Sequence, residues 1–551
     1  MKYLEKWILL STVLGLLTGI VVALFDYATN LTLWAFFSEL FSQNVLWIFP
    51  CVASALLFAG FILSRSTEPI GSGTDEVVKA YNQEDGRMEL RSFPEKMLAA
   101  VATIGLGGSA GQEGPSVYAG GIVGVWLWNK LRRVAVTDQD RRILILAGAA
   151  AGIGAIFKAP FTGIIFALEA PFKDDLAHDA LVPSLVAAVS SYLTLIAIDG
   201  SRPLFSFPSL VSLNLVDIGA SALLALIVGV CALGFIFVYK TVRKVLHSFS
   251  HRFYVKALIG AVGISIIGIL SVLLYHRAYP LGISYDIINL SLASNTAAGT
   301  LLRLFILKLV ATSLTLGSTG VGGIFVPQIV MGATLGGFFG QMFFPSRVDL
   351  FVAVGMASFL AAGYKTPLAS VAFVAETTAG PGYLIPSLIA AAVSYAVTGE
   401  ASVSEFQKLR DEVDISAIVH LRASDLMTKR VVAVPGDISL LDFIEEYLFT
   451  YQHKRFPVVD PEGLIGVISG AEVRLIPREK WFQVKVSDVC DRNFTTAYPD
   501  TNVQDVLDLM DSKGIGRVSI VDRAKPKRIV GIISKTDIIK AIERERLGTG
   551  T

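Results

Sequence analysis

Hydrophobic runs long enough to cross a lipid bilayer recur along the first 400 residues of this 551-residue chain. A helix needs about 20 mainly apolar residues to span the hydrocarbon core of a membrane. Runs close to that length lie near residues 7–25, 45–64, 180–198, 216–238, 255–275 and 382–398. This pattern predicts a polytopic α-helical membrane domain, and the first run, which no small-residue cleavage site follows, is expected to remain as its first helix.

Other apolar segments of the same region are shorter, and Gly and Pro interrupt them. They lie near residues 97–107, 117–128, 143–157, 161–170, 303–316, 323–340, 350–362 and 367–375. An interrupted helix leaves backbone groups unpaired, which a membrane tolerates only where they line a polar site or are buried in protein. We therefore expect these segments to surround a polar site inside the domain.

The membrane domain contains an internal repeat. The stretch GAAAGIGAIFKAPFTGIIFALE (148–169) is echoed by GMASFLAAGYKTPLASVAFVAE (355–376). Residues that correspond at one offset are Gly148/Gly355, Lys158/Lys365, Pro160/Pro367, Phe166/Phe373 and Glu169/Glu376. The stretches GGSAGQEGP and GSTGVGGIFVP upstream also correspond. Interrupted segments at matching places in two halves, here about 10–200 and 215–400, are typical of a transport site.

The character of the chain changes near residue 400. Residues 401–551 hold 22 of the 47 Lys and Arg residues and 23 of the 46 Asp and Glu residues. Two stretches, FPVVDPEGLIGVISGAEV (456–473) and VSIVDRAKPKRIVGIISKTDI (518–538), each read as strand, turn, strand and helix start. We expect a membrane domain at 1–404, a linker at 405–420, and a tandem α+β module whose copies, 421–483 and 484–545, share a core.

Composition narrows the function classes. The net charge of +1 gives no indication of a nucleic-acid partner. The three cysteines, Cys51, Cys231 and Cys490, fit no metal-ligand spacing and suggest no disulfide framework. No nucleophile–base pair or metal-ligand set is visible, so we expect neither an enzyme nor a metal site.

Three glycine-flanked motifs precede apolar helical patterns: GSGTD (71–75), GQEGP (111–115) and GIFVP (323–327). Helix N-termini present unpaired N–H groups and the positive end of the helix dipole. Several such termini converging inside a membrane would bind an anion without a full positive charge. The binding would then be weak enough for the anion to be released. The motifs therefore predict selectivity for anions.

Glu113, in the second motif, is a carboxylate where an anion is expected. An acid at membrane depth is costly and by default suggests function. It can compete with the anion while ionised and move aside when protonated, which links proton and anion occupancy. The structural alternative is a glutamate that only caps a helix start.

These motifs, together with the duplicated AGAAAGIGAIFKAPFTGIIFALE stretch, resemble the CLC family of chloride channels and chloride/proton antiporters over about residues 10–405. The resemblance implies a fold of two inverted repeats with broken, re-entrant helices and one pore in each subunit of a homodimer. It implies that Glu113 is the gating glutamate and proton acceptor. The implied anion-binding residues are Ser72, whose hydroxyl would coordinate the ion, Ile324 and Phe325, whose amides would donate to it, and Gly73, Gly111, Gly114 and Ser404.

The chain departs from the family pattern at four places. Gln112 stands where the family has arginine, and Asp75 where it has proline. The inner glutamate that many antiporters of the family carry is here Ala170, and Ser404 takes the place of the pore tyrosine, with Phe406 a poorer match. These departures leave open whether the protein is an antiporter or a passive channel.

The tail, about residues 421–545, resembles a pair of CBS domains, which often bind adenine nucleotides. In GIISKTD (531–537) the resemblance places Ser534 or Thr536 near phosphate and lets Asp537 accept from ribose hydroxyls. The first copy has Glu472 in place of the aspartate, which argues against a second equivalent site. The alternative is a tail that only stabilises the dimer.

The sequence thus predicts chloride-selective transport, most simply chloride/proton exchange gated by Glu113 and regulated by ATP, ADP or AMP at the CBS pair, with no required cofactor. The alternative is a passive gated chloride channel. A more remote alternative is a CBS-bearing divalent-cation transporter, which would need acidic clusters in the membrane domain. We expect an integral protein of a prokaryotic plasma membrane, in contact with the lipid bilayer, that dimerises through its membrane and CBS domains. The soluble tail and the basic KYLEK start suggest cytoplasmic termini and CBS domains.

Overall fold

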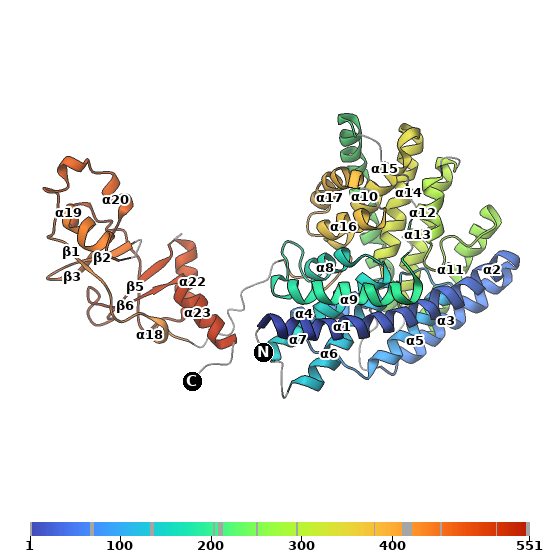
Figure 1. Ribbon diagram of the computed structural model, residues 1–551, viewed down its shortest axis with the longest axis horizontal. Helices are drawn as coiled ribbons and strands as arrows, with labels where there is room; N and C mark the ends of the chain where they lie inside the picture. The colour runs from blue at the N-terminus through green and yellow to red at the C-terminus, as the bar shows by residue number, and fades with distance from the viewer. Residues whose placement is uncertain are drawn as a thin grey trace. The chain divides into compact units, whose positions relative to one another are not determined.

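The computed structural model describes residues 3–66, 71–132, 137–201, 204–205, 207, 213–249, 252–293, 296–378, 381–409, 421–451, 455–513 and 515–546. The chain forms two compact units, Met1–Asp411 and Glu412–Thr551. The described part of the first unit is helical, whereas the second contains two small sheets (Figure 1).

The first half of the first unit comprises α1 (Tyr3–Asp26), α2 (Ala35–Gln43), α3 (Ile48–Leu63), α4 (Thr74–Gln83), α5 (Ser92–Gly105), α6 (Glu113–Leu131), α7 (Asp138–Ile156), α8 (Pro160–Glu169) and α9 (Leu181–Asp199). The second half comprises α10 (Leu215–Phe249), α11 (Phe253–Tyr275), α12 (Tyr285–Leu292), α13 (Ala298–Gly317), α14 (Phe325–Phe343), α15 (Val348–Tyr364), α16 (Pro367–Thr377) and α17 (Leu384–Thr398).

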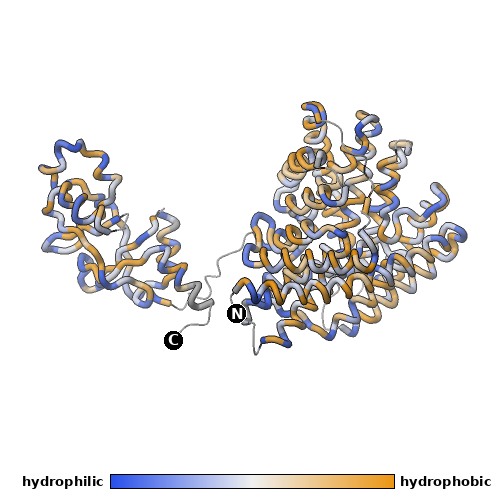
Figure 2. The backbone as a smooth tube through the Cα atoms, in the orientation of Figure 1, coloured by the Kyte–Doolittle hydropathy of each residue, from blue (hydrophilic) through white to orange (hydrophobic). Residues whose placement is uncertain are grey.

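Seven helical stretches in the described part of the chain are long and apolar enough to cross a membrane. Hydrophobic residues predominate along the helices of the first unit (Figure 2). Large apolar side chains are exposed on several of the seven stretches, for example Val230 on α10 and Leu273 on α11, both more than 60% exposed. Such a surface suits lipid rather than water. Several lengths differ from expectation: the segments 303–316 and 350–362 lie in 20-residue apolar stretches, whereas the run 382–398 yields only the 15-residue α17.

The internal repeat is visible in the packing. A Cβ atom on Gly148 of α7 would collide with the carbonyl of Gly120 in α6, and one on the matching Gly355 of α15 would collide with the carbonyl of Gly332 in α14. Both halves therefore use a glycine at the same place to bring two helices into backbone contact. The matching prolines also share a task, because each is the first residue of its helix, α8 or α16.

The repeat-related glutamates join the two halves. Glu169, the last residue of α8, accepts hydrogen bonds from Leu368 N (3.0 Å) and Ala369 N (2.7 Å) at the start of α16. Reciprocally, Glu376 near the end of α16 accepts bonds from Phe161 N (2.9 Å) and Thr162 N (2.7 Å) at the start of α8. Each short helix thus satisfies the free N–H groups of the other.

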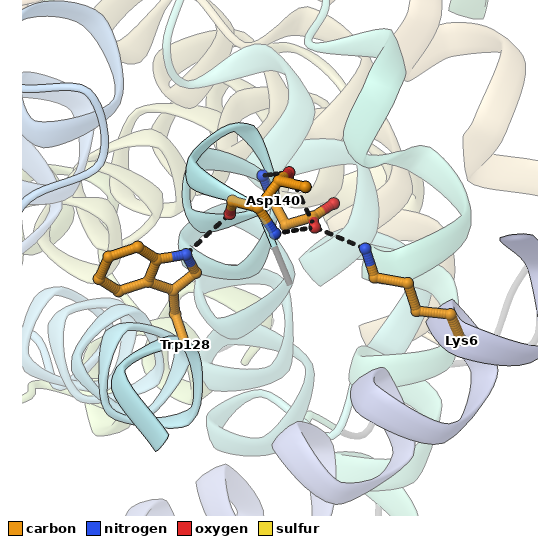
Figure 3. Close-up of polar contacts among 4 residues, drawn as sticks. Lys6, Trp128 and Asp140 are labelled. Atoms are coloured by element: carbon orange, nitrogen blue, oxygen red, sulfur yellow. Dashed lines mark hydrogen bonds and ion pairs between the residues drawn. The ribbon is translucent and has the colours of Figure 1, made fainter. Parts of the chain in front are cut away.

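A polar contact joins α1, α6 and α7 near one end of the unit (Figure 3). Lys6 Nζ of α1 donates to Asp140 Oδ2 of α7 at 2.5 Å. The same oxygen accepts from Thr137 N at 2.6 Å, and Trp128 Nε1 of α6 donates to Thr137 O at 2.8 Å. The start of α7 is therefore held by both neighbouring helices.

The second unit contains two copies of one sheet pattern. Its strands are β1 (Val434–Pro435), β2 (Arg455–Asp460), β3 (Gly463–Ser469), β4 (Thr496–Ala497), β5 (Arg517–Val521) and β6 (Ile529–Ser534). In each copy the first strand pairs in parallel with the second, which pairs antiparallel with the third. The strand, turn, strand prediction is confirmed for both copies.

The helices of the second unit are α18 (Ala423–Leu426), α19 (Leu440–Asp442), α20 (Gly470–Arg474), α21 (Val486–Val489), α22 (Val503–Ser512) and α23 (Lys535–Arg546), and a π-helical turn, Phe443–Leu448, continues α19. Ala423, near the start of the first copy, packs in the core of the second, and Val486, near the start of the second, packs in the core of the first. The copies therefore have two separate cores rather than the one shared core expected, and each contributes a residue to its neighbour's core.

Candidate functional site

The three glycine motifs meet inside the first unit. Gly111 N donates to Gly323 O (2.9 Å) and Gly323 N to Gly111 O (2.7 Å), so the second and third motifs form a short antiparallel bridge. The first motif packs against the same place, because a Cβ atom on Gly114 would collide with the carbonyl of Ser72. Gly73 has a φ of 87°, which favours glycine. The starts of α4, α6 and α14 thus lie together.

Glu113 occupies the centre of this junction and is fully buried. Its Oε1 accepts hydrogen bonds from Phe325 N at 2.6 Å and Val326 N at 3.3 Å, the first amides of α14. Its Oε2 is buried and has no hydrogen-bond partner among the described residues. The carboxylate therefore lies where the unpaired N–H groups and the dipole of α14 attract an anion.

The structure alters the expected set of backbone donors. Phe325 N and Val326 N both donate to Glu113, although the motif did not single out Val326, and Ile324 is the residue before the helix. The amides of Gly73 and Gly111 are engaged elsewhere, with Glu76 Oε2 (2.7 Å) and Gly323 O. These two glycines permit close backbone approach rather than offering free donors.

Ser72 and Ser404 lie on either side of Asp75. Ser72 Oγ accepts from Asp75 N at 3.2 Å, and Ser404 Oγ donates to Asp75 Oδ1 at 2.5 Å. All three residues are buried. The segment after α17, which includes part of the expected linker, therefore packs into the first unit at the turn that carries Ser72.

An aromatic cluster surrounds Phe325. Its ring contacts Phe157, Phe373 and Phe166 at centroid distances of 4.9, 5.2 and 5.4 Å, and Phe166 contacts Tyr364 at 5.6 Å. Phe166 and Phe373 correspond in the repeat, so both halves contribute to the wall of the site. This wall excludes water from the start of α14, which strengthens the attraction of its amides for charge.

Lys308 was missed by the motif analysis. It lies on α13, is fully buried, and donates to Ser284 Oγ at 2.7 Å and Gly282 O at 3.1 Å. It also interacts electrostatically with Glu113. A single lysine inside the apolar segment 303–316 was the available signal, since a charged residue at membrane depth needs a partner or a role.

Two of the residues that depart from the family pattern, Gln112 and Ala170, have hydrogen-bond partners in the structure. Gln112 Nε2 donates to Asp26 Oδ1 at 2.9 Å and to Thr29 Oγ1. Ala170 is buried, and its carbonyl accepts from Gln407 Nε2 at 3.0 Å. Ala170 therefore contributes a backbone acceptor and no group that can carry a proton.

No three His, Cys, Asp or Glu side chains gather as a metal site within the described ranges. In the second unit, a cavity of about 150 Å³ is lined by the guanidinium-bearing Arg430, Arg455 and Arg517 and by Ser534 and Asp537. Such a cluster of arginines suits phosphate. Thr536 is not among the lining residues.

Ser534 and Asp537 also form a helix cap. Ser534 donates to Asp537 Oδ2 through N (2.9 Å) and Oγ (2.6 Å) at the start of α23. Ser469 makes the same bonds to Glu472 Oε2 in the first copy. Although burial acts to raise it, the bonds from Ser469 hold the pKa of the Glu472 carboxyl below its usual value. The longer glutamate is thus used as a cap.

Fold and site together define a membrane transport protein, since two matched halves of interrupted helices hold an anion-attracting centre in the interior. The voltage gated chloride channel family matches residues 55–399, and the CBS domain family matches residues 423–475 and 486–544. The chain belongs to the voltage gated chloride channel family. It is accordingly a membrane-embedded transport protein rather than an enzyme, and its C-terminal region contains CBS domains.

Named relatives include exchangers. The chain is 29% identical over 401 residues to the H(+)/Cl(-) exchange transporter ClcA of Yersinia pseudotuberculosis serotype IB, covering 69% of this chain and 82% of that protein. It is 29% identical over 398 residues to ClcA of Vibrio cholerae serotype O1, covering 69% and 83%. An uncharacterized protein of Methanocaldococcus jannaschii is 28% identical over 403 residues, 72% of this chain and 95% of that one.

Solved structures share the fold. A CLC-type fluoride/proton antiporter superposes with a TM-score of 0.63 at 24% identity, covering 74% of this chain and 99% of that chain. A slow cyanobacterial Cl-/H+ antiporter gives 0.63 at 23% identity, covering 71% and 94%. A eukaryotic CLC transporter superposes with a TM-score of 0.58 at 19% identity. The match covers 97% of this chain and 98% of that chain, so it includes the second unit.

Proposed function

We propose that this protein exchanges chloride for protons across a membrane and that Glu113 is both its gate and its proton acceptor. The observation that carries the proposal is the position of the Glu113 carboxylate on the first amides of α14. The exchange activity named for the bacterial relatives supports the choice of ions.

In the proposed mechanism, chloride and protons are linked through Glu113. Ionised Glu113 and chloride compete for Phe325 N and Val326 N, because both are anions that accept from the same donors. A proton added to Oε2, which has no partner in the described part of the chain, neutralises the side chain. The neutral carboxyl loses its attraction to α14 and leaves the amides to chloride, with Ser72 and Ser404 as further ligands.

Paired flux measurements on proteoliposomes test this proposal. Under a chloride gradient we expect the wild type to move protons opposite in direction to chloride, and E113Q to move chloride without protons. Glutamine has nearly the same shape but cannot be ionised at this site. E400Q, which changes an exposed glutamate at the end of the first unit, serves as the control and should keep proton coupling.

Two results would contradict the exchange mechanism. Chloride flux without proton flux in the wild type would identify a passive gated channel instead. Proton flux that persists in E113Q would show that another group accepts the proton.

The second unit is proposed to bind an adenine nucleotide, ATP, ADP or AMP, and to regulate exchange. The support is the cavity of three arginines, in which Arg430, Arg455 and Arg517 would hold phosphate oxygens and Asp537 would accept from a ribose hydroxyl. We further propose a homodimer through both units in a prokaryotic plasma membrane, with the termini and CBS domains cytoplasmic.

A further inference from the structure

Asp75 is a buried carboxylate that the proposed exchange does not yet use. It is 6% exposed at the start of α4, and Ser404 Oγ donates to it. No lysine or arginine within the described ranges forms an ion pair with it. Its neighbour Glu76 differs, because Glu76 caps α4 through Gly73 N and pairs with Lys96 at 3.0 Å. Glu76 therefore has a charged partner, whereas the hydrogen bond to Asp75 Oδ1 comes from the neutral hydroxyl of Ser404.

Asp75 lies close to the Glu113 site. It belongs to the turn that contains Ser72, and the Ser72 carbonyl packs against Gly114, the residue after Glu113. The two acids therefore lie at neighbouring places, Asp75 in this turn and Glu113 next to the glycine that packs against it.

The segment that holds Ser404, the hydrogen-bond partner of Asp75, reaches the surface at its next residue. Glu405 directly follows Ser404, and its carboxylate pairs with Arg243 of α10 at 3.1 Å. The Glu405 side chain is 41% exposed and the Arg243 side chain 25%. This ion pair marks the face from which the chain leaves the first unit, here called the residue-405 face.

Burial opposes the charged form of Asp75, and the charged and titratable groups around it act in opposite directions. They are Glu76 of α4, Tyr239 and Arg243 of α10, Tyr364 of α15, and Glu405 of the segment after α17. Arg243 attracts a negative Asp75 but is shared with Glu405, while Glu76 repels it and is itself compensated by Lys96. A carboxyl in these surroundings can both take up and release a proton.

We propose that Asp75 carries protons between the residue-405 face and Glu113, the task for which Ala170 offers no titratable group. This inference rests on the proposed exchange. A proton from water at this face forms an O–H bond on Asp75. That bond breaks as the proton passes through water in the anion path and forms an O–H bond on Glu113. Glu113 releases it on the opposite face, and chloride moves the other way.

The test is the D75N variant of the full-length protein in proteoliposomes. Asparagine keeps an oxygen that accepts from Ser404 but cannot carry a proton. We expect chloride flux to persist and proton flux to be lost, as in E113Q. D75E should keep coupling. The matched control is D217N, which neutralises another buried aspartate, one that pairs with Arg347 at 3.5 Å, and should also keep coupling.

The outcomes separate the two proposals. Proton flux in D75N at the wild-type ratio to chloride, with none in E113Q, would overturn the role of Asp75 alone. A wild type that moves no protons would overturn the exchange and this role with it. If D75N does not fold, D75E decides: a shifted pH for half-maximal proton flux from the residue-405 face supports the proposal, and an unchanged pH overturns it.

Discussion

At the scale of single residues, the centre of the first unit depends on missing side chains as much as on present ones. Gly114 and Gly323 leave no room for a Cβ atom, because one on Gly114 would collide with Ser72 O and one on Gly323 with Glu113 Oε1. Without these close approaches the Glu113 carboxylate could not lie against Phe325 N. Packing therefore fixes where the negative charge is held.

Replacing Gly114 with alanine tests this close approach. We expect G114A to lower the free energy of unfolding by about 1–3 kcal/mol, the usual cost of overpacking, and to reduce chloride flux. Thermal unfolding in detergent and flux per reconstituted protein are the measurements. G234A is the control, since no atom lies within 4 Å of a Cβ placed there. Equal stability of G114A and G234A would contradict the packing argument.

Sequence patterns identified some of the buried charged residues of the site and missed others. Glu113 stood out because an acid between glycines in an apolar region has few explanations. Lys308 and Asp75 are also buried, yet Lys308 lies in a segment without a motif, and Asp75 was noted only as a replacement for the family's proline. Their importance depends on contacts with distant residues, such as Ser404, that no local pattern encodes.

At the scale of helices, the two short segments α8 and α16 complete each other. Their glutamates supply the acceptors for amides that a helix start leaves unpaired, and lipid could not replace them. The repeat predicted that Glu169 and Glu376 are equivalent. It could not predict that each caps the other's helix, because the alignment of two segments does not say which ends meet.

Neutralising one cap tests its contribution. E376Q keeps one oxygen but loses the charge that accepts from Phe161 N and Thr162 N, so we expect a loss of about 1–3 kcal/mol in the free energy of unfolding. The ratio of protons to chloride should be unchanged, which a flux assay checks. E400Q, at an exposed site, should match the wild type in thermal unfolding. A changed ratio in E376Q would instead indicate a role in proton transfer.

At the scale of the whole molecule, sequence periodicity predicted both repeats and the change of character near residue 400. The lengths of individual helices were predicted less well, because an apolar run does not show where a helix begins and ends in a packed interior. The cavity proposed for a nucleotide was only partly visible from sequence. Its motif pointed to Ser534 and Asp537, whereas Arg430, Arg455 and Arg517 come from separate segments that folding brings together.

The proposed nucleotide binding at that cavity can be tested on the full-length protein. We expect R517A to weaken ATP or AMP binding about tenfold or more, since it removes a charge-assisted contact to phosphate. Isothermal titration calorimetry measures the change, and binding should also weaken with added salt. R474A is the control, because the Arg474 guanidinium donates to Gly470 O and does not line the cavity. Identical affinities for both variants would exclude this cavity as the site.

The exchanged caps of α8 and α16 also bear on how the chain is made. When a ribosome has just completed α8, the acceptor for its Phe161 amide lies 215 residues further along the chain. Until that glutamate is synthesised, the first helix start cannot be placed in lipid at low cost. We therefore expect the start of α8 to reach its final place in the membrane only after α16 has been made.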